Sequence, residues 1–153
     1  MREAAVDAGL PGDLADRLER RWGELQPWPE AAGVLARLAA HIPLAVATNC
    51  SERLGRAAAA RAGDRFAVVI TAETAGFYKP RPEPYLAALR ALGTRPERTL
   101  FVAGSASDVP GAQGAGMPVY WHNRMHLPAR DGARAEHCEP SLHRLADIAI
   151  PPA

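Results

Sequence analysis

The sequence predicts an α/β fold in which a parallel sheet is covered by helices. Short apolar runs alternate with helical patterns along the chain, as is typical of parallel strands joined by crossover helices. Three ionisable or hydroxyl side chains, Thr48, Lys79 and Asp108, each follow one of these apolar runs. A chain of 153 residues with 48% hydrophobic content also suits one globular domain that buries a core.

Two helices are expected before the first strand. Apolar residues recur at three- and four-residue spacings over 13–25, behind Asp13 as an N-cap, and the Pro-Trp-Pro segment at 27–29 ends this amphipathic helix. A second helix is expected to begin at Pro29, since proline suits a first helical turn, and to end near His41. Its expected buried side chains are Val34, Leu35 and Leu38.

Strands and helices are then expected to alternate. Ser51 suits the N-cap of the first crossover helix, the proline-rich segment 79–84 delays the next helix until Pro84, and Gly93 ends that helix. A loop is expected over 125–134. The expected strands are 42–47, 67–70, 99–103 and 119–121, and the expected helices are 51–62, 84–92, about 108–115, and 141–148.

Charge and cysteine content narrow the classes of function. A formal net charge of +1 creates no large basic field, so we expect a small-molecule ligand and neither a nucleic acid nor a membrane as partner. Cys50 and Cys138 lack CxxC spacing, which argues against zinc and favours reduced thiols. No window approaches the ~20 apolar residues that span a bilayer. These features predict a cytoplasmic protein.

Polar side chains gather at the carboxyl ends of the expected strands. Ligands of open parallel sheets bind at this edge, because loops converge there and helix N-termini expose N–H groups. Thr48 and Asn49 offer a hydroxyl and an amide to a carboxylate or phosphate, and a simple helix cap is an equal alternative. The candidate residues at this edge are Thr48, Asn49, Lys79, Ser105 and Asp108.

Lys79 is the only lysine among 18 basic residues, which favours a functional role over that of a solvated surface lysine. A fixed ammonium neutralises a nucleophilic carboxylate or the charge that develops on a substrate. Asp108 has three alternatives: it binds a metal, orients Lys79 or caps its helix. The five histidines show no metal-ligand spacing, so we interpret them as surface or structural residues.

From about Pro29 to the C-terminus, the chain resembles the haloacid dehalogenase superfamily of hydrolases. Val46-Ala-Thr-Asn-Cys-Ser51 is similar to the second motif of that family, Tyr78-Lys-Pro-Arg-Pro-Glu-Pro-Tyr85 to the third, and 101–116 to the fourth. The resemblance implies a Rossmannoid parallel sheet with helices on both faces. It also implies that the catalytic residues are Thr48, Lys79 and Asp108.

The fourth motif separates two branches of that superfamily. Phosphatases typically carry GDSxxD, in which two acids help hold Mg²⁺, whereas this chain has Gly104 at the first acid of Ala103-Gly-Ser-Ala-Ser-Asp108. The 2-haloacid dehalogenases also lack that acid and need no metal, and Trp121-His-Asn-Arg124 is similar to their WxNR segment. The resemblance therefore favours a dehalogenase without a cofactor, and Mg²⁺ at Asp108 belongs to the phosphatase alternative. The implied substrate-binding residues are Asn49, Tyr85, Ser105 and Asn123.

The nucleophile of the family is an aspartate in a DxDGT-like or DxxGT-like motif at the end of the first, central strand. This chain carries neither motif, and Asp7, Asp13 and Asp16 follow no apolar strand. We therefore interpret residues 1–28 as a remnant of the helical cap and 29–153 as the α/β core, with the first strand and most of the cap missing. The chain alone is expected to be inactive.

A missing central strand would leave the strands at 42–47 and 99–103 without their shared neighbour. Its loss would expose backbone donors and acceptors, so these strands either pair directly with each other or something else fills the gap. The expected outcomes are a marginally stable protein, an oligomer such as a homodimer, or an incomplete gene product.

Two hypotheses of function follow from the residues and the resemblance. In the first, the complete enzyme is a hydrolase that acts on a small 2-haloacid or related carboxylate through an aspartyl ester, and a Mg²⁺-dependent phosphatase is its alternative. In the second, the chain is a non-catalytic fragment of the fold that binds a ligand or assembles with a partner.

Overall fold

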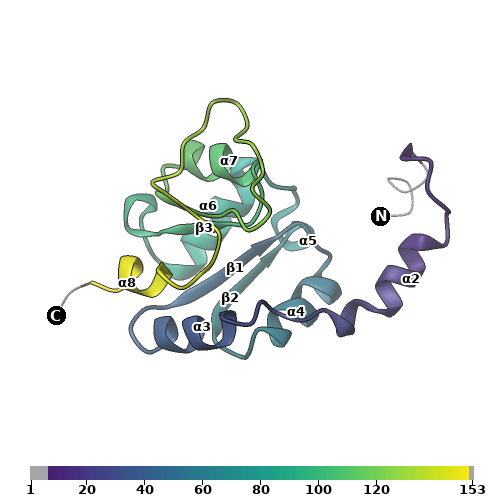
Figure 1. Ribbon diagram of the computed structural model, residues 1–153, viewed down its shortest axis with the longest axis horizontal. Coiled ribbons are helices and arrows are strands. Elements are labelled where there is room, and N and C mark those ends of the chain that lie inside the picture. The colour runs from purple at the N-terminus through teal and green to yellow at the C-terminus, as the bar shows by residue number, and fades with distance from the viewer. Residues whose placement is uncertain (1–6, 152–153) are drawn as a thin grey trace.

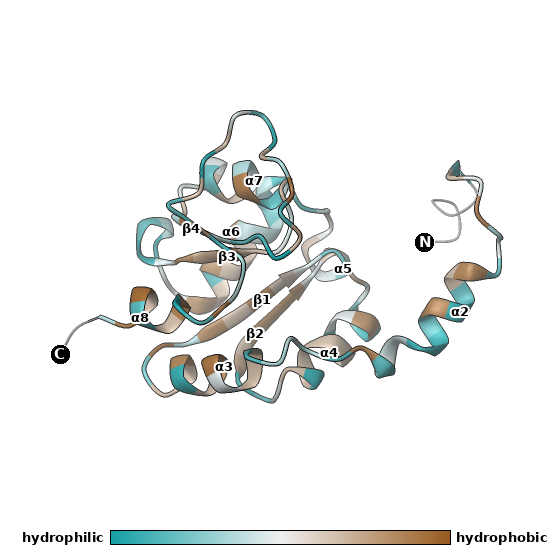
Figure 2. Cartoon of the chain, in the orientation of Figure 1, coloured by the Kyte–Doolittle hydropathy of each residue, from teal (hydrophilic) through white to brown (hydrophobic). Residues whose placement is uncertain are grey.

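The computed structural model describes residues 7–151, and it confirms the predicted α/β fold class with two parallel sheets (Figure 1). The first sheet pairs β1 (Leu44–Thr48) with β2 (Phe66–Thr71), and both strands are rich in apolar residues (Figure 2). The second sheet has the order β3 (Phe101–Ala103), β4 (Val119–His122) and β5 (His137–Glu139).

Helices connect and cover these strands. The α-helices are α2 (Leu14–Arg20), α3 (Ala31–Ala39), α4 (Glu52–Arg61), α5 (Ala72–Ala75), α6 (Pro82–Leu92), α7 (Asp108–Gly114) and α8 (Leu145–Ala149), and the 3-10 helices are η1 (Trp22–Glu24) and η2 (Pro96–Arg98). None of the helices within residues 7–151 is long and apolar enough to cross a bilayer.

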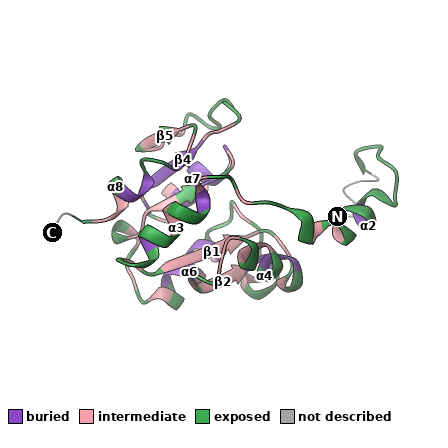
Figure 3. Ribbon diagram, turned by 60° about the horizontal axis from the view of Figure 1, so that its bottom comes forward, coloured by how far each residue is buried: buried purple, intermediate pink, exposed green. Residues whose placement is uncertain are grey.

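The core lies on both faces of the second sheet. Val119 and Trp121 of β4 face an apolar cluster formed with α6 and α7, whereas Tyr120 between them faces a second cluster formed with α3 and α8. Successive side chains of a strand point to opposite faces of its sheet. The expected arrangement with helices on both faces is therefore confirmed, and β4 is buried along its whole length (Figure 3).

The two sheets do not pair with each other. Within residues 7–151, β1 pairs with β2 alone and β3 pairs with β4 alone. Direct pairing between the strands at 42–47 and 99–103, one of the two expected alternatives, is therefore wrong. The sheets are joined by side chains instead, since Leu44 and Leu100 both pack against the α3 and α8 cluster.

Local sequence signals explain most element ends. Ser51 caps α4, because its Oγ accepts a hydrogen bond from the Leu54 N–H at 3.4 Å. Gly93 ends α6 in the left-handed conformation, with φ of 66°, as expected of a glycine C-cap.

Other boundaries differ from the predictions. The N-terminal helix is shorter than expected, since α2 ends at Arg20, and the Asp13 side chain makes no cap bond. The helix expected from Pro84 begins at Pro82, because prolines are tolerated in a first turn where the N–H has no helical partner. The short elements α5 and β5 were not predicted, and three residues of mixed polarity such as His137–Glu139 carry no strand periodicity.

The segment before α3 projects from the core in Figure 1 and is mostly exposed in Figure 3. Leu14 and Leu18 of α2 are 38% and 44% exposed. Trp22 fixes the segment to α4 by donating its indole N–H to the Leu54 carbonyl at 2.9 Å, and Glu19 pairs with Arg53 at 2.7 Å. The division into a cap remnant over 1–28 and a core over 29–153 stays a prediction.

Candidate active site

Lys79 and Asp108 form a largely buried ion pair at the carboxyl ends of β1 and β3. The Lys79 Nζ lies 3.0 Å from Asp108 Oδ2, and each side chain is 12% exposed. The same ammonium lies over the Phe101 ring, 5.5 Å from its centroid. Of the alternatives for Asp108, the structure shows the contact with Lys79, and the N-cap position of α7 belongs to Ser107.

Tyr85 completes the surroundings of the Asp108 carboxylate. Its hydroxyl donates to Asp108 Oδ1 at 3.3 Å, and its fully buried ring meets the Phe101 ring edge to face, with centroids 5.0 Å apart. Burial, and then the negative charge of Asp108, raises the pKa of Tyr85 well above its usual value. Tyr85 is therefore a protonated donor at neutral pH, and each oxygen of Asp108 has its own donor.

Asn49 holds the backbone of Lys79. Its Oδ1 accepts from the Lys79 N–H at 2.7 Å, and its Nδ2 donates to the Lys79 carbonyl at 3.1 Å. Thr48, at the end of β1, accepts from the Cys50 N–H at 3.3 Å through Oγ1, which leaves the hydroxyl hydrogen to be donated elsewhere. The end of β1 therefore positions the Lys79 backbone through Asn49.

Ser105 supports Asp108 through the backbone. Its Oγ accepts from the Asp108 N–H at 3.3 Å and lies 3.2 Å from the Ser107 Oγ. Asn123, in contrast, is bound within the loop that follows β4, where it accepts from the Leu127 N–H at 2.8 Å and donates to the Leu127 carbonyl at 2.9 Å. The structure thus connects Asn49, Lys79, Tyr85, Ser105 and Asp108, with Thr48 adjacent, and leaves Asn123 outside this network.

Two glycines and one aromatic residue near the site were missed by sequence reasoning. A Cβ at Gly111 of α7 would lie 2.5 Å from the Tyr85 hydroxyl oxygen, and one at Gly55 of α4 would lie 2.8 Å from a methyl carbon of Thr71. Both helices therefore approach the site more closely than an alanine would allow. A glycine inside a helical pattern is the signal that points to such contacts, whereas Phe101 looks in sequence like any apolar strand residue.

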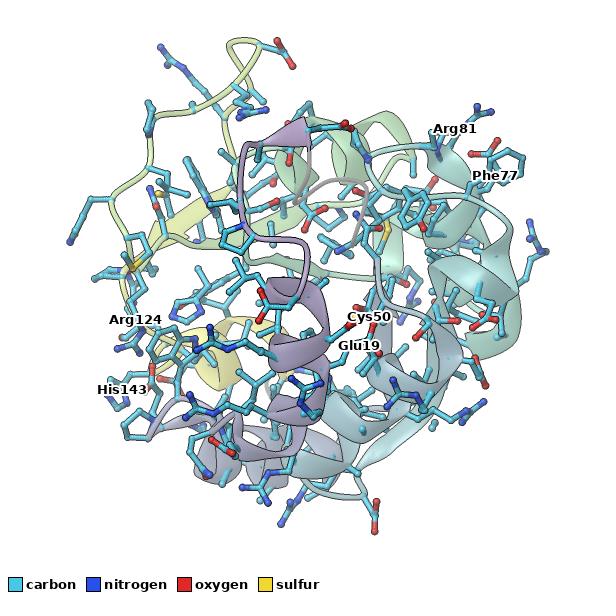
Figure 4. All side chains as sticks on the ribbon, turned by 90° about the vertical axis from the view of Figure 1, so that its right-hand side faces the viewer. Glu19, Cys50, Phe77, Arg81, Arg124 and His143 are labelled. Atoms are coloured by element: carbon cyan, nitrogen blue, oxygen red, sulfur yellow. The ribbon has the colours of Figure 1, made fainter. Side chains whose placement is uncertain are left out.

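Arg124 lies in a separate cluster. Its guanidinium pairs with Glu30 and lies over the Trp28 ring, 4.3 Å from the centroid. In Figure 4 it lies across the molecule from Arg81 and Phe77, which stack on each other two residues on either side of Lys79. The Trp121 to Arg124 segment therefore ties the start of α3 to the second sheet.

In the cluster around Arg124, the pKa values of Glu30 and His122 are both lowered. The pKa of Glu30 lies below its usual value. Hydrogen bonds from the backbone N–H groups of Glu30 and Leu142 lower it, as does the contact with Arg124, whereas burial of the carboxyl raises it. Burial, and then the positive charge of Arg124, lowers the pKa of His122. His122 is therefore a neutral, buried structural residue, and Arg124 donates to its Nε2 at 3.4 Å.

The residues of this chain do not by themselves fit a Mg²⁺ ion at Asp108. Both carboxylate oxygens are engaged by Lys79 and Tyr85, and Gly104 supplies no ligand at the position of the first acid. In the part of the chain that the structure describes, no three His, Cys, Asp or Glu side chains are grouped so that they could hold a metal. Cys50 and Cys138 are free thiols, as expected.

Comparisons with known proteins agree with this architecture. The model of the family described as haloacid dehalogenase-like hydrolase matches residues 3–116. An (S)-2-haloacid dehalogenase of Xanthobacter autotrophicus is 35% identical over 108 residues, which are 69% of this chain and 42% of the relative. A phosphoglycolate phosphatase of Rhodospirillum rubrum is 38% identical over 120 residues, which are 76% of this chain and 50% of the relative.

A solved structure shows the same fold. The crystal structure of a dehalogenase with an intermediate complex has a TM-score of 0.84 and 27% identity, and the match covers 99% of this chain and 70% of that one. The chain spans about half the length of the two curated relatives it matches above.

Proposed function

This chain belongs to the haloacid dehalogenase-like hydrolases, and from that membership we propose that it supplies the supporting half of a site that hydrolyses a small 2-haloacid or related carboxylate. The nucleophile of the proposed reaction is an aspartate that lies outside these 153 residues. The similarity to an (S)-2-haloacid dehalogenase and the absence of an acid at Gly104 support this choice of substrate class.

The buried pair of Lys79 and Asp108 is the observation that carries the proposal. An ammonium has three N–H donors, of which one is directed at Asp108 Oδ2. The remaining donors suit the carboxylate of the nucleophilic aspartate at the carboxyl ends of β1 and β3. Because the Lys79 and Asp108 side chains are largely buried there, the charge interaction is strong. Asp108 and Tyr85 fix the ammonium, and Asn49 fixes the backbone that carries it.

In the proposed reaction, the aspartate carboxylate attacks the carbon that bears the halogen. A C–O bond forms, the C–halogen bond breaks, and the halide leaves with the bonding electron pair. Water then attacks the ester carbonyl, which releases a 2-hydroxy acid and a proton and restores the aspartate. Splitting one displacement into two steps in this way is the advantage of covalent catalysis. Thr48 and the amides at the start of α4 are proposed to bind the substrate carboxylate, with Asn49, Tyr85 and Ser105 as further contacts, whereas Asn123, whose amide is bound to Leu127, is not included among the proposed contacts.

Restoring the nucleophile tests this function. An extended protein with an upstream apolar strand bearing DxxGT is expected to release halide from 2-chloropropionate, and changing that aspartate to asparagine is expected to abolish the release. Lys79→Ala in the extended protein should have the same effect. A folded extended protein that releases no halide would contradict the proposal.

Phosphatase activity is the second candidate, because the phosphoglycolate phosphatase shares 38% identity with this chain. Phosphate release from phosphoglycolate by the extended protein, dependent on added Mg²⁺ and stopped by a chelator, would assign the chain to that branch. A non-catalytic role is the third, and turnover by the 153-residue chain that Lys79→Ala abolishes would exclude it.

A further inference from the structure

Phe101, the first residue of β3, contacts both side chains that donate to the Asp108 carboxylate. The Lys79 Nζ lies over the Phe101 ring, 5.5 Å from its centroid, and the Tyr85 ring meets the same ring edge to face, with centroids 5.0 Å apart. Lys79 donates to Asp108 Oδ2, and Tyr85 donates to Oδ1. One half-buried aromatic ring therefore lies against both of these donors.

The Lys79 ammonium needs a second contact to be held in one place. The hydrogen bond to Asp108 fixes the distance between the two charges, but the flexible lysine side chain can still turn about its last bonds. The face of an aromatic ring attracts a cation within about 6 Å of its centroid, and it does so more strongly where water is excluded. Lys79 is only 12% exposed, so its contact with Phe101 meets both conditions.

The Phe101 ring is itself fixed by the second sheet. The Phe101 N–H donates to the Pro118 carbonyl at 2.8 Å, and the residue pairs with the fully buried Val119 of β4. Its side chain packs against the apolar cluster that β4 forms with α6 and α7. A side chain on a packed strand is a more precise support than one on a loop. Phe101 therefore gives Lys79, which lies in a loop, a support on the sheet.

A neutral ring suits this place better than a second acid would. Lys79 and Asp108 together carry no net charge, and a further carboxylate beside them would make the site negative. That charge would repel the nucleophilic carboxylate of the proposed function. An aromatic ring attracts the ammonium through the negative potential of its face and adds no charge. The ammonium is thus held while it stays available to a carboxylate.

We propose that Phe101 is a positioning residue, whose ring face holds the Lys79 ammonium in the place where it serves the active site. The proposal rests on the proposed function for the role of that ammonium, but the contact is measured without turnover. Lys79 is the only lysine of the chain. Isotope-labelled lysine therefore gives one side-chain signal in the NMR spectrum of the 153-residue protein, and this signal needs no assignment.

The expected signature of a fixed Lys79 side chain is two separate Hε resonances and restricted motion of Cε in relaxation measurements. Phe101→Leu keeps an apolar side chain and removes the ring, so the two resonances should merge and the motion should increase. Trifluorophenylalanine incorporated at position 101 should act in the same direction, because fluorine withdraws charge from the ring face while the ring still packs. Phe101→Tyr keeps the ring face and should preserve the signature. Phe66→Leu, which removes another half-buried ring at the start of β2, is the control and should also preserve it.

The fluorinated ring separates attraction of the cation from packing. A Lys79 signal that is unchanged with trifluorophenylalanine at position 101 would overturn the proposal, even if Phe101→Leu alters it. In the extended protein, Phe101→Leu is expected to lower kcat for halide release about tenfold or more with little change in KM, because a misplaced catalytic group slows the chemical step. If the extended wild-type protein releases no halide while the Lys79 signal still depends on Phe101, the proposed function is rejected and the positioning of the ammonium stands.

Discussion

The side-chain amide of Asn49 and the backbone of Lys79 are joined by two hydrogen bonds, although 30 residues separate them in the chain. Asn49 follows β1, and Lys79 lies in the loop between α5 and α6. The end of one strand-helix unit therefore fixes the lysine of the next. Since Lys79 in turn pairs with Asp108 at the start of α7, three consecutive units share one polar network.

Replacing Asn49 with alanine should loosen this network. Each bond contributes about 0.5–1.5 kcal/mol net, so we expect Asn49→Ala to lower the free energy of unfolding by about 1–3 kcal/mol. Urea denaturation measures the loss. Gln26→Ala, which removes a single exposed bond to the Glu24 carbonyl, is the control and should change stability by less than about 0.5 kcal/mol. Equal effects of the two changes would contradict the role given to Asn49.

The buried pair of Lys79 and Asp108 should be strongly coupled. Lys79→Met leaves the carboxylate without its cation, and Asp108→Asn leaves the ammonium without its anion. Each single change is therefore expected to cost about 3–5 kcal/mol. The double variant should lose clearly less than the sum, with a coupling energy of about 1–3 kcal/mol from a denaturation cycle.

The exposed pair of Arg37 and Asp147 is the matched control for that cycle. Its atoms are as close, at 2.7 Å, but the side chains are 55% and 64% exposed. The coupling energy in Arg37→Met and Asp147→Asn should therefore stay below about 1 kcal/mol. Similar coupling in both pairs would show that burial does not strengthen the Lys79 contact.

The sequence was sufficient for the features that depend on local pattern. Apolar runs predict β1 to β4, and strand ends at one sheet edge predict that Lys79, Asp108 and Asn49 meet. The strand β5 was missed because three residues of mixed polarity have no detectable period. Asn123 was expected to contact the substrate with these residues. In the structure its side-chain amide binds the backbone N–H and carbonyl of Leu127 in its own loop. The sequence does not show the three-dimensional path of that loop, so this pairing could not be predicted.

Tyr85→Phe tests the second donor of Asp108. The change removes the hydroxyl bond to Oδ1 and keeps the ring that packs against Phe101. The expected loss is about 1–3 kcal/mol, because a buried acceptor is left unpaired. Tyr78→Phe, at a side chain that is 66% exposed, should be nearly neutral in the same urea titration. A neutral Tyr85→Phe would mean that Asp108 is satisfied by Lys79 alone.

His122 should make the fold less stable in acid. Its pKa is lowered in the folded chain by burial and by Arg124, so the unfolded chain binds the proton more readily as pH falls through its ordinary value of 6.5. The contribution of neutral His122 is therefore fully present above that value and is lost on acidification, despite the opposing charge of Glu30. Between about pH 8 and pH 5.5, wild type should lose more stability than His122→Gln. The exposed His143 provides the control, and His143→Gln should follow wild type.

Gly55 should be required for the close approach of α4 to the first sheet. An alanine Cβ at this position would lie 2.8 Å from the Thr71 methyl carbon and 2.9 Å from that of Thr48. Gly55→Ala is therefore expected to destabilise the fold by about 1–3 kcal/mol through overpacking.

Gly33, inside α3, is the matched control, because no atom lies within 4 Å of a Cβ added there. Gly33→Ala should accordingly stabilise the chain by about 0.5–1 kcal/mol through helix propensity alone. Thermal denaturation of both variants measures the difference, and stabilisation by Gly55→Ala would show that α4 moves away from Thr48 at little cost.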